Sequence, residues 1–261
     1  MKKYISSGVR FSNDSYIFDY DLNELDDIIE ISHPQLYYST SPTQKVYWFG
    51  YTFNSDVSSK ERSKFIKYIK GLSEVKPSYS ELSRFIEYPL SELNKLTPIS
   101  SFDCFVYPLS NRSKLVTDIV KAVGNFAQRD IKRCSFELVK SAPIDIEFDW
   151  DMFESENGYD THRYNQMVNY IESNLLPKIK NLDYFSLANN VKPKYRRYIK
   201  NFLSFKSEDL AKFEKLRGQR ILVVDDRNTS GSTLTEILRI LQRINNTCDV
   251  YVYTLIGPIN R

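Results

Sequence analysis

One segment near the C-terminus constrains the fold more than any other. Residues 220–234 read RILVVDDRNTSGSTL: an apolar run ends in two acids, small hydroxyl residues follow, and a helix-forming run begins near Gly231. This order predicts a buried strand, a polar loop and a helix. In open α/β sheets, ligands bind beyond the carboxyl ends of the strands. We therefore expect Asp225 and Asp226 at the mouth of a binding site.

The chain around this segment alternates strands and helices from Phe102 onward. Such alternation favours an α/β fold with a central, mainly parallel sheet and helices on its faces. The expected strands are residues 102–107, 135–139, 144–150, 184–187, 220–224 and 250–255. The expected helices are residues 114–127, 161–182, 208–216 and 232–244.

The N-terminal third has a more mixed pattern. The aromatic run KVYWFGYTF at residues 45–53 predicts a strand, and Ser59 is suited to cap a helix that follows it. Pro and Ser residues then interrupt the pattern at residues 97–101. We expect an α+β accessory region over residues 1–97 and an α/β core over residues 98–261.

Composition excludes several classes of protein. Lysine and arginine total 36 against 33 acids, and the net charge of +3 is too small to indicate nucleic-acid binding. The three cysteines are far apart and match no metal-ligand spacing. The N-terminus lacks the apolar run of a signal peptide, and no run approaches the roughly 18 apolar residues of a membrane span. We expect a cytoplasmic protein with no membrane partner.

The residues after the apolar run suit a sugar phosphate. Two adjacent carboxylates can accept hydrogen bonds from vicinal hydroxyls, such as those of a ribose. The hydroxyl side chains and approachable amides from Thr229 to Thr233 lie at a predicted helix N-terminus, where the dipole favours an anion. The segment therefore predicts carboxylates beside a phosphate cradle.

Residues 221–233 also resemble the phosphoribosyl pyrophosphate signature of type I phosphoribosyltransferases. The signature has four apolar residues, two acids, two variable positions, and then hydroxyl, hydroxyl, Gly, any residue, hydroxyl. The resemblance extends from about residue 215 to the end of the chain. It implies a type I phosphoribosyltransferase-like core in which Asp225 and Asp226 hold the ribose. It also implies that the 5′-phosphate is enclosed by Asn228, Thr229, Ser230, Gly231, Ser232 and Thr233.

Residues 102–114 (FDCFVYPLSNRSK) resemble the first strand and pyrophosphate loop of the family's competence-associated, ComF-like branch. The resemblance implies that Ser110 and Asn111 bind the pyrophosphate and that Arg112 is its cationic, catalytic partner. The Mg²⁺ would arrive on the pyrophosphate, and no protein metal ligands are expected. Glycines of other branches are missing here, so a surface turn with a solvated arginine remains the alternative.

Three further charged segments each have a functional and an ordinary interpretation. The basic segment before residue 205 resembles the family's mobile catalytic loop through Arg197, Asn201 and Phe205, or is a solvated helix face. Acids alternate with apolar residues over 144–151, so a strand there would place four of them on one face: Asp145, Glu147, Asp149 and Asp151. This face would meet Mg²⁺ or basic residues of the accessory region, or, as we favour, be a solvated edge. A basic stripe on the predicted helix near residue 65 is favoured as solvated surface and consists of Lys60, Lys64 and Lys67.

A receiver domain also opens with an apolar strand and paired acids, but too few residues follow Asp226 to complete one. The resemblance implies transfer of phosphoribose to a nitrogen acceptor, with release of pyrophosphate. Thr229 stands where members acting on 6-oxopurines carry an acid, which argues against that substrate and leaves the acceptor unknown.

Two other functions stay open. One is a non-catalytic regulator that binds phosphoribosyl pyrophosphate or a nucleotide, or an effector in a bacterial nucleic-acid or defence system. The other is a nucleic-acid-binding module acting through the lysine stripe. A protein or nucleic-acid partner would contact residues 1–97, and a homo-oligomer is compatible with the sequence.

Overall fold

The structure is a computed structural model in which the strand of the acid pair lies at the centre of a sheet. Strand β11 (Arg220–Arg227) pairs in parallel with β6 (Cys104–Pro108) on one side and with β12 (Asp249–Ile256) on the other. The described residues are 8–12, 15–19, 29–30, 37–38, 46–53, 57–110, 113–158, 160–228 and 231–257.

Parallel pairing continues outward from this central triplet. β7 (Ser135–Lys140) joins β6, and β5 (Val46–Phe53) joins β12, both in parallel. The short β10 (Leu203–Phe205) adds an antiparallel edge to β7. The central sheet therefore has the order β10-β7-β6-β11-β12-β5 and is mostly parallel, which confirms the expected α/β class.

Four short strands from the start of the chain extend the sheet beyond β5. β3 (Ile29–Glu30) pairs with β5, β1 (Gly8–Ser12) with β3, and β2 (Ser15–Asp19) with β1, all antiparallel. β4 (Tyr37–Tyr38) also pairs with β5.

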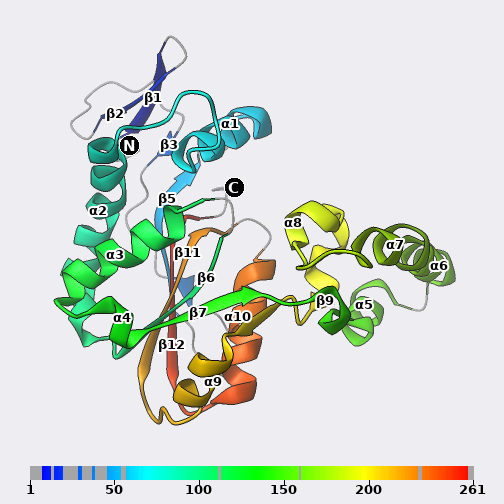
Figure 1. Cartoon of the computed structure of the whole chain (residues 1–261). Coiled ribbons are helices and arrows are strands. Elements are labelled where there is room, and N and C mark those ends of the chain that lie inside the picture. The colour runs from blue at the N-terminus through cyan, green and yellow to red at the C-terminus, as the bar shows by residue number, and fades with distance from the viewer. Residues whose placement is uncertain are drawn as a thin grey trace.

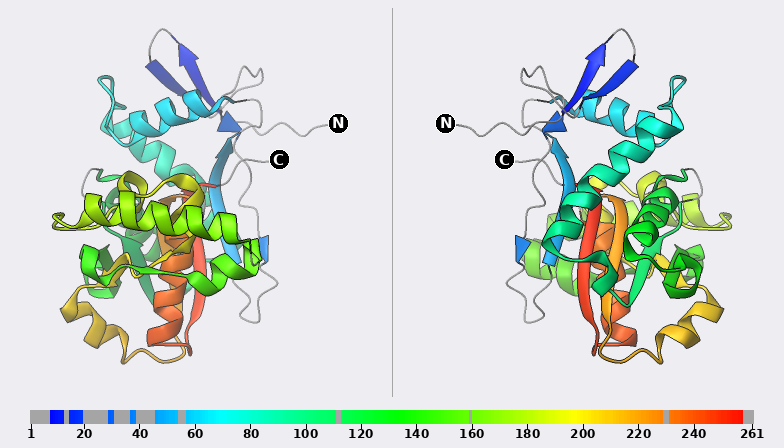
Figure 2. Two further views of the ribbon diagram at one scale, coloured as in Figure 1. Left: turned by 90° about the vertical axis from the view of Figure 1, so that its right-hand side faces the viewer. Right: turned by 90° about the vertical axis from the view of Figure 1, so that its left-hand side faces the viewer.

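Helices cover both faces of the sheet because its central strands are apolar on both sides. One face carries α1 (Ser59–Ile69), α2 (Tyr79–Leu96) and α3 (Leu115–Ala127), and the short α4 (Ile131–Cys134) packs beside α3. The other face carries α9 (Ser207–Phe213) and α10 (Ser232–Ile244). Figures 1 and 2 show α2 and α3 on one side of the sheet and α10 on the other.

Residues on the two sides of the 97–101 break share one sheet and one core. β5 pairs with β12, and α2 packs against α3. One hydrophobic cluster contains Trp48 and Phe85 from before the break together with Ile119 and Leu222 from after it. The break therefore separates two consecutive elements that belong to a common core.

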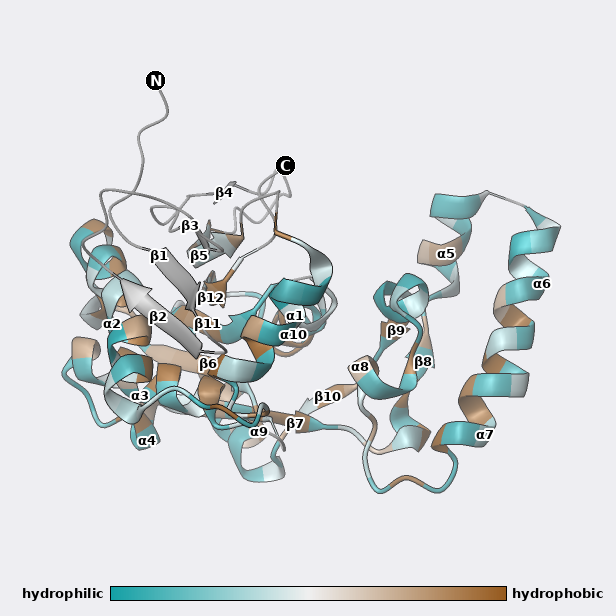
Figure 3. Cartoon of the chain, turned by 90° about the horizontal axis from the view of Figure 1, so that it is seen from above, coloured by the Kyte–Doolittle hydropathy of each residue, from teal (hydrophilic) through white to brown (hydrophobic). Residues whose placement is uncertain are grey.

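The segment from residue 141 to 202 forms an insert between β7 and β10, and Figure 3 shows it extending to one side of the sheet. Its helices are α5 (Trp150–Asn157), α6 (Thr161–Tyr170), α7 (Leu176–Ile179) and α8 (Leu187–Asn190). A π-helical stretch, Ile171–Leu175, joins α6 to α7. The three together form the long helix that was expected at residues 161–182. The 3-10 stretch Pro193–Tyr198 follows α8.

Two expected strands are wrong. At residues 144–150, the 3-10 turn Pro143–Asp145 comes first, and only β8 (Glu147–Phe148) is extended, paired with β9 (Ile199–Lys200) outside the main sheet. Residues 184–187 form no strand and instead lead into α8. The turn after Pro143 and the Asp149 cap of α5 replace the first strand, and the start of α8 replaces the second. Among the described residues, no helix is both long and apolar enough to cross a membrane.

Candidate functional site

The site lies where the connections of the sheet diverge. From β6 the chain passes through α3 to β7 on one side, and from β11 it passes through α10 to β12 on the other. Neighbouring strands whose connections leave in opposite directions open a crevice at their carboxyl ends. A cleft of about 450 Å³ opens there, and its lining includes Ser110 after β6, Asp225 and Asp226 of β11, and Thr233 of α10.

The acid pair ends a fully buried strand. Residues 221–224 have no measurable exposure, whereas Asp225 and Asp226 are 6% and 7% exposed. Successive side chains of a strand point to opposite faces. Leu222 and Val224 lie in the core beneath α1 to α3, so the side chain of Asp226 points to that face of the sheet. The side chain of Asp225 points to the opposite face, which α10 covers. Both carboxylates still line the cleft because they lie at the end of the strand.

The two carboxylates have different electrostatic surroundings. The backbone N–H of Asp226 donates to Oδ1 of Asp225 at 2.8 Å. Burial, and then the neighbouring charge of Asp226, raise the pKa of Asp225 well above its usual value. Oδ2 of Asp226 lies 2.5 Å from Nζ of Lys70, at the end of α1. The pair therefore favours hydroxyl donors or a cation over a second anion.

The expected phosphate cradle begins at a constrained backbone. Gly231 precedes α10 with φ of +73°, a left-handed conformation that favours glycine, and has no side chain to cap the helix. Thr233 lines the cleft, and Ser232 is buried. The backbone N–H of Asn228 donates to the Ile256 carbonyl at 2.8 Å, which ties the loop to β12. A helix start of this kind can present amides to an anion.

Some of the expected site lies outside the described residues. These positions are Asn111, Arg112, Thr229 and Ser230. On their borders, Ser110 lines the cleft and its Oγ accepts from the Ser113 N–H at 3.3 Å. The structure therefore brings Ser110, Thr233 and the acid pair to one cleft.

The cleft contains three basic residues that the sequence did not indicate, together with Arg196 from the basic segment before residue 205. Its lining includes Lys70 from α1, Lys140 from β7, Arg196 from the insert and Arg227 from β11. Burial lowers the pKa of Arg227. Four basic residues against two acids indicate an anionic ligand. No local pattern could have identified Lys70, because only the fold brings α1 to β11.

The insert supplies the wall opposite the strands. Residues 185–189 and Arg196 of the insert line the cleft. The guanidinium of Arg196 donates to the carbonyls of Val191 at 3.0 Å and Ala188 at 2.8 Å. Phe202 and Leu203 complete this wall. The insert therefore reaches the cleft as well as projecting from the sheet.

The residues that resemble the family's mobile loop contact other parts of the protein. Arg197 pairs with Glu156 at 2.6 Å. Asn201 has φ of +59° and accepts from Arg239 at 2.5 Å. Phe205 is buried in β10. Arg196, next to Arg197, is the arginine of this segment that lines the cleft.

The other charged segments have structural contacts or ordinary exposure. The expected acidic face at 144–150 is wrong, because Asp149 caps α5 by accepting from the Met152 N–H and pairs with Lys200 at 2.6 Å. The stripe of Lys60, Lys64 and Lys67 is exposed on α1.

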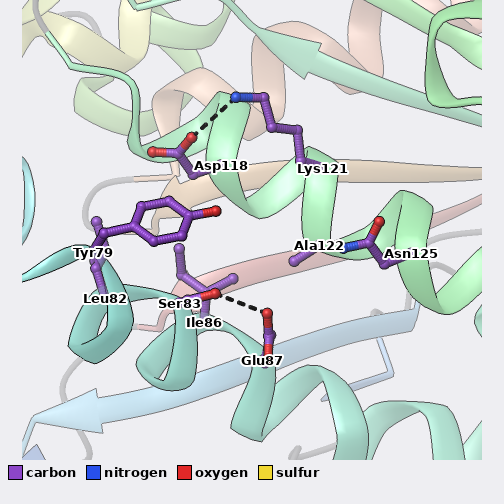
Figure 4. Close-up of a pocket in the computed structure, with 9 residues that line it drawn as sticks. All are labelled: Tyr79, Leu82, Ser83, Ile86, Glu87, Asp118, Lys121, Ala122 and Asn125. Atoms are coloured by element: carbon purple, nitrogen blue, oxygen red, sulfur yellow. Dashed lines mark hydrogen bonds and ion pairs between the residues drawn. The ribbon is translucent and has the colours of Figure 1, made fainter.

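A second pocket of about 50 Å³ lies between α2 and α3 (Figure 4). Its polar side chains interact with each other: Lys121 pairs with Asp118 at 3.5 Å, and Ser83 donates to Glu87 at 2.8 Å. This pocket is small. The 450 Å³ cleft at the carboxyl ends of β6 and β11, called the switch-point cleft below, is therefore the better candidate for a sugar phosphate.

Comparison of the chain with models of protein families gave no match, and no curated protein matches it.

Proposed function

We propose that the cleft binds phosphoribosyl pyrophosphate. The observation that carries the proposal is the convergence of a buried acid pair, the start of α10 and several basic side chains on one switch-point cleft. Asp225 and Asp226 would accept hydrogen bonds from the ribose hydroxyls, and the loop leading to Thr233 would hold the 5′-phosphate. The proposal includes a type I phosphoribosyltransferase-like core and a cytoplasmic location.

The pyrophosphate would extend along the end of β6. Ser110 lies at that end, and Asn111 and Arg112 follow it in the chain. Mg²⁺ would arrive bound to the pyrophosphate. A cation near the acid pair would favour the charged form of Asp225, which burial disfavours.

Transfer would proceed by departure of pyrophosphate from the ribose and attack of a nitrogen acceptor on the exposed carbon. The protein would contribute mainly positioning and charge stabilisation. Arg112 would stabilise the charge on the departing group. The acceptor would enter between the strand ends and the wall formed by residues 185–189.

A second candidate is binding of the same ligand without transfer, as a regulator or as an effector of a bacterial nucleic-acid or defence system. The observation that favours it is the position of Arg197 and Asn201, which are held by Glu156 and Arg239 rather than facing the cleft. A cleft without Arg197 lacks the cation that the resemblance expects of the catalytic loop.

Calorimetric titration with phosphoribosyl pyrophosphate and Mg²⁺ tests the shared part of both candidates. We expect the Asp225→Asn, Asp226→Asn double variant to lose binding. The matched control is Glu208→Gln, Asp209→Asn, another adjacent acid pair, which lies at the start of α9 and not among the residues that line the cleft. Equal binding by wild type and the acid-pair variant would refute the site.

Pyrophosphate release with a panel of nitrogen heterocycles separates the two candidates. The Arg112→Ala variant should abolish release if the protein is a transferase, while ligand binding persists. Wild-type binding with no release from any acceptor would favour the regulator.

A further inference from the structure

Lys70 belongs to the N-terminal third of the chain but lies inside the switch-point cleft. Its Nζ lies 2.5 Å from Oδ2 of Asp226, and the side chains of the two residues are only 22% and 9% exposed. Lys70 lines the same cleft as Ser110 and Thr233. Asp226, which is expected to accept a hydrogen bond from a ribose hydroxyl, is therefore already paired with the ammonium group of Lys70.

The backbone beneath Lys70 is fixed. The inward face of α1 is buried in the main core through Phe65, Ile66 and Ile69. The helix then ends at a left-handed Gly71, and the N–H of Leu72 donates to the carbonyl of Lys67 at 2.8 Å. Only the four-carbon side chain of Lys70 is left to change position, and such a stem can direct its charge to several places.

The ligand would change the best partner of this ammonium group. Ribose hydroxyls compete with Lys70 for the oxygens of Asp226, whereas phosphate oxygens offer the ammonium a stronger partner than a hydroxyl does. If the ligand has a pyrophosphate, Lys70 can exchange its ion pair with Asp226 for an ion pair with a phosphate oxygen. A sugar phosphate without the pyrophosphate must also displace Lys70 from Asp226, but it offers the ammonium group no such partner in return.

We propose that Lys70 is a specificity-determining residue that leaves Asp226 for the pyrophosphate when the ligand binds. It thereby favours phosphoribosyl pyrophosphate over the plain sugar phosphate. This inference rests on the proposed function, and it assigns part of the ligand site to a segment that precedes residues 98–261, where the sequence predicted the whole site.

The test compares two ligands by calorimetry: phosphoribosyl pyrophosphate with Mg²⁺, and ribose 5-phosphate. We expect Lys70→Met to bind the first roughly tenfold more weakly, the scale of one charged hydrogen bond. It should bind the second at least as tightly as wild type does. Lys70→Arg should restore most of the preference, and the control is Lys67→Met, on an exposed position of the same helix.

Three results would overturn this role, and they are distinguishable from one another. Equal weakening of both ligands by Lys70→Met would show a structural role only, and thermal unfolding of that variant would reveal any loss of folding. Wild-type affinity of Lys70→Met for both ligands would show that Lys70 takes no part in binding either of them. Wild-type protein that binds neither ligand would overturn the proposed function, and the role of Lys70 with it.

Discussion

The two walls of the cleft are built in different ways. The wall that carries the acid pair consists of regular elements, with β11 between β6 and β12 and α10 starting beside them. The opposite wall belongs to the insert and is held by polar side chains: Lys178 donates to the carbonyl of Asn189 at 2.8 Å, and Oδ1 of Asn190 accepts from the Ser186 N–H at 2.8 Å.

The two walls therefore differ in how firmly their residues are held. The strand wall is fixed by backbone pairing and by cores on both faces of the sheet, so its groups hold their positions. The insert wall is anchored in the core through Phe185 and Phe202, but residues 186–189 form no strand and are tied by individual hydrogen bonds, so substitutions there can reshape it without altering the sheet. Under the proposed function, the strand wall would recognise the sugar phosphate and the insert wall would recognise the acceptor.

The largest contrast should come from placing one acid in each region. Val223→Asp puts a charge into the centre of β11, where Val223 has no exposure, and should cost more than about 4 kcal/mol of unfolding free energy. Ile144→Asp alters a residue of the insert that is 91% exposed and should change stability by less than about 0.5 kcal/mol. Urea unfolding measures both, and similar effects would contradict the different burial of β11 and the insert surface.

A smaller effect is expected at the joint between the insert and α10. Arg239 bonds Glu236, which is 3% exposed, at 2.8 and 3.0 Å, and also bonds Asn201. Arg239→Met leaves a buried carboxylate without its partner and should cost about 3 kcal/mol in chemical denaturation. Adding Glu236→Gln should recover part of that loss, whereas strictly additive losses would argue against coupling.

The raised pKa of Asp225 predicts a pH dependence of stability. The unfolded chain releases this proton near pH 4, while the folded protein retains it to higher pH. The folded state then binds more protons, so its stability falls as pH rises from about 4 toward the folded pKa, by at most about 1.4 kcal/mol per unit. Asp225→Asn should reduce this slope in thermal unfolding, and an unchanged slope would contradict the assignment.

The smallest predicted effect is local to the insert wall. Asn190→Ala removes the acceptor for the Ser186 N–H and should cost about 1 kcal/mol. Hydrogen exchange should accelerate in peptides covering residues 185–191 and stay unchanged in β11. Equal acceleration in both would show that the walls open as one unit.

The strand wall was largely predictable from the sequence, whereas in the insert the long helix expected at 161–182 is confirmed and the two expected strands are wrong. The run from Ile221 to Val224 and the helix after Gly231 follow local periodicity, and the structure confirms both. The alternation at residues 144–150 looks equally regular, but the turn after Pro143 and the cap at Asp149 break the strand. Local pattern is therefore reliable where an element is long and buried.

Two other features show what local pattern omits. Helix α2 has a capping box, in which Ser78 and Glu81 bond each other's backbone, but Pro89 interrupts its interior and the helix was not among the expected elements. Lys70 reaches the acid pair only because β5 joins the central sheet through β12, which places the following helix α1 beside β11. Contacts of this kind depend on strand order.

Hydrogen exchange with and without phosphoribosyl pyrophosphate and Mg²⁺ tests the location of the site most directly. We predict protection of peptides covering residues 104–113 and 222–235, and loss of that protection in the Asp225→Asn, Asp226→Asn variant. Protection confined to other parts of the chain, or equal protection in the variant, would contradict the assignment of the ligand to the switch-point cleft.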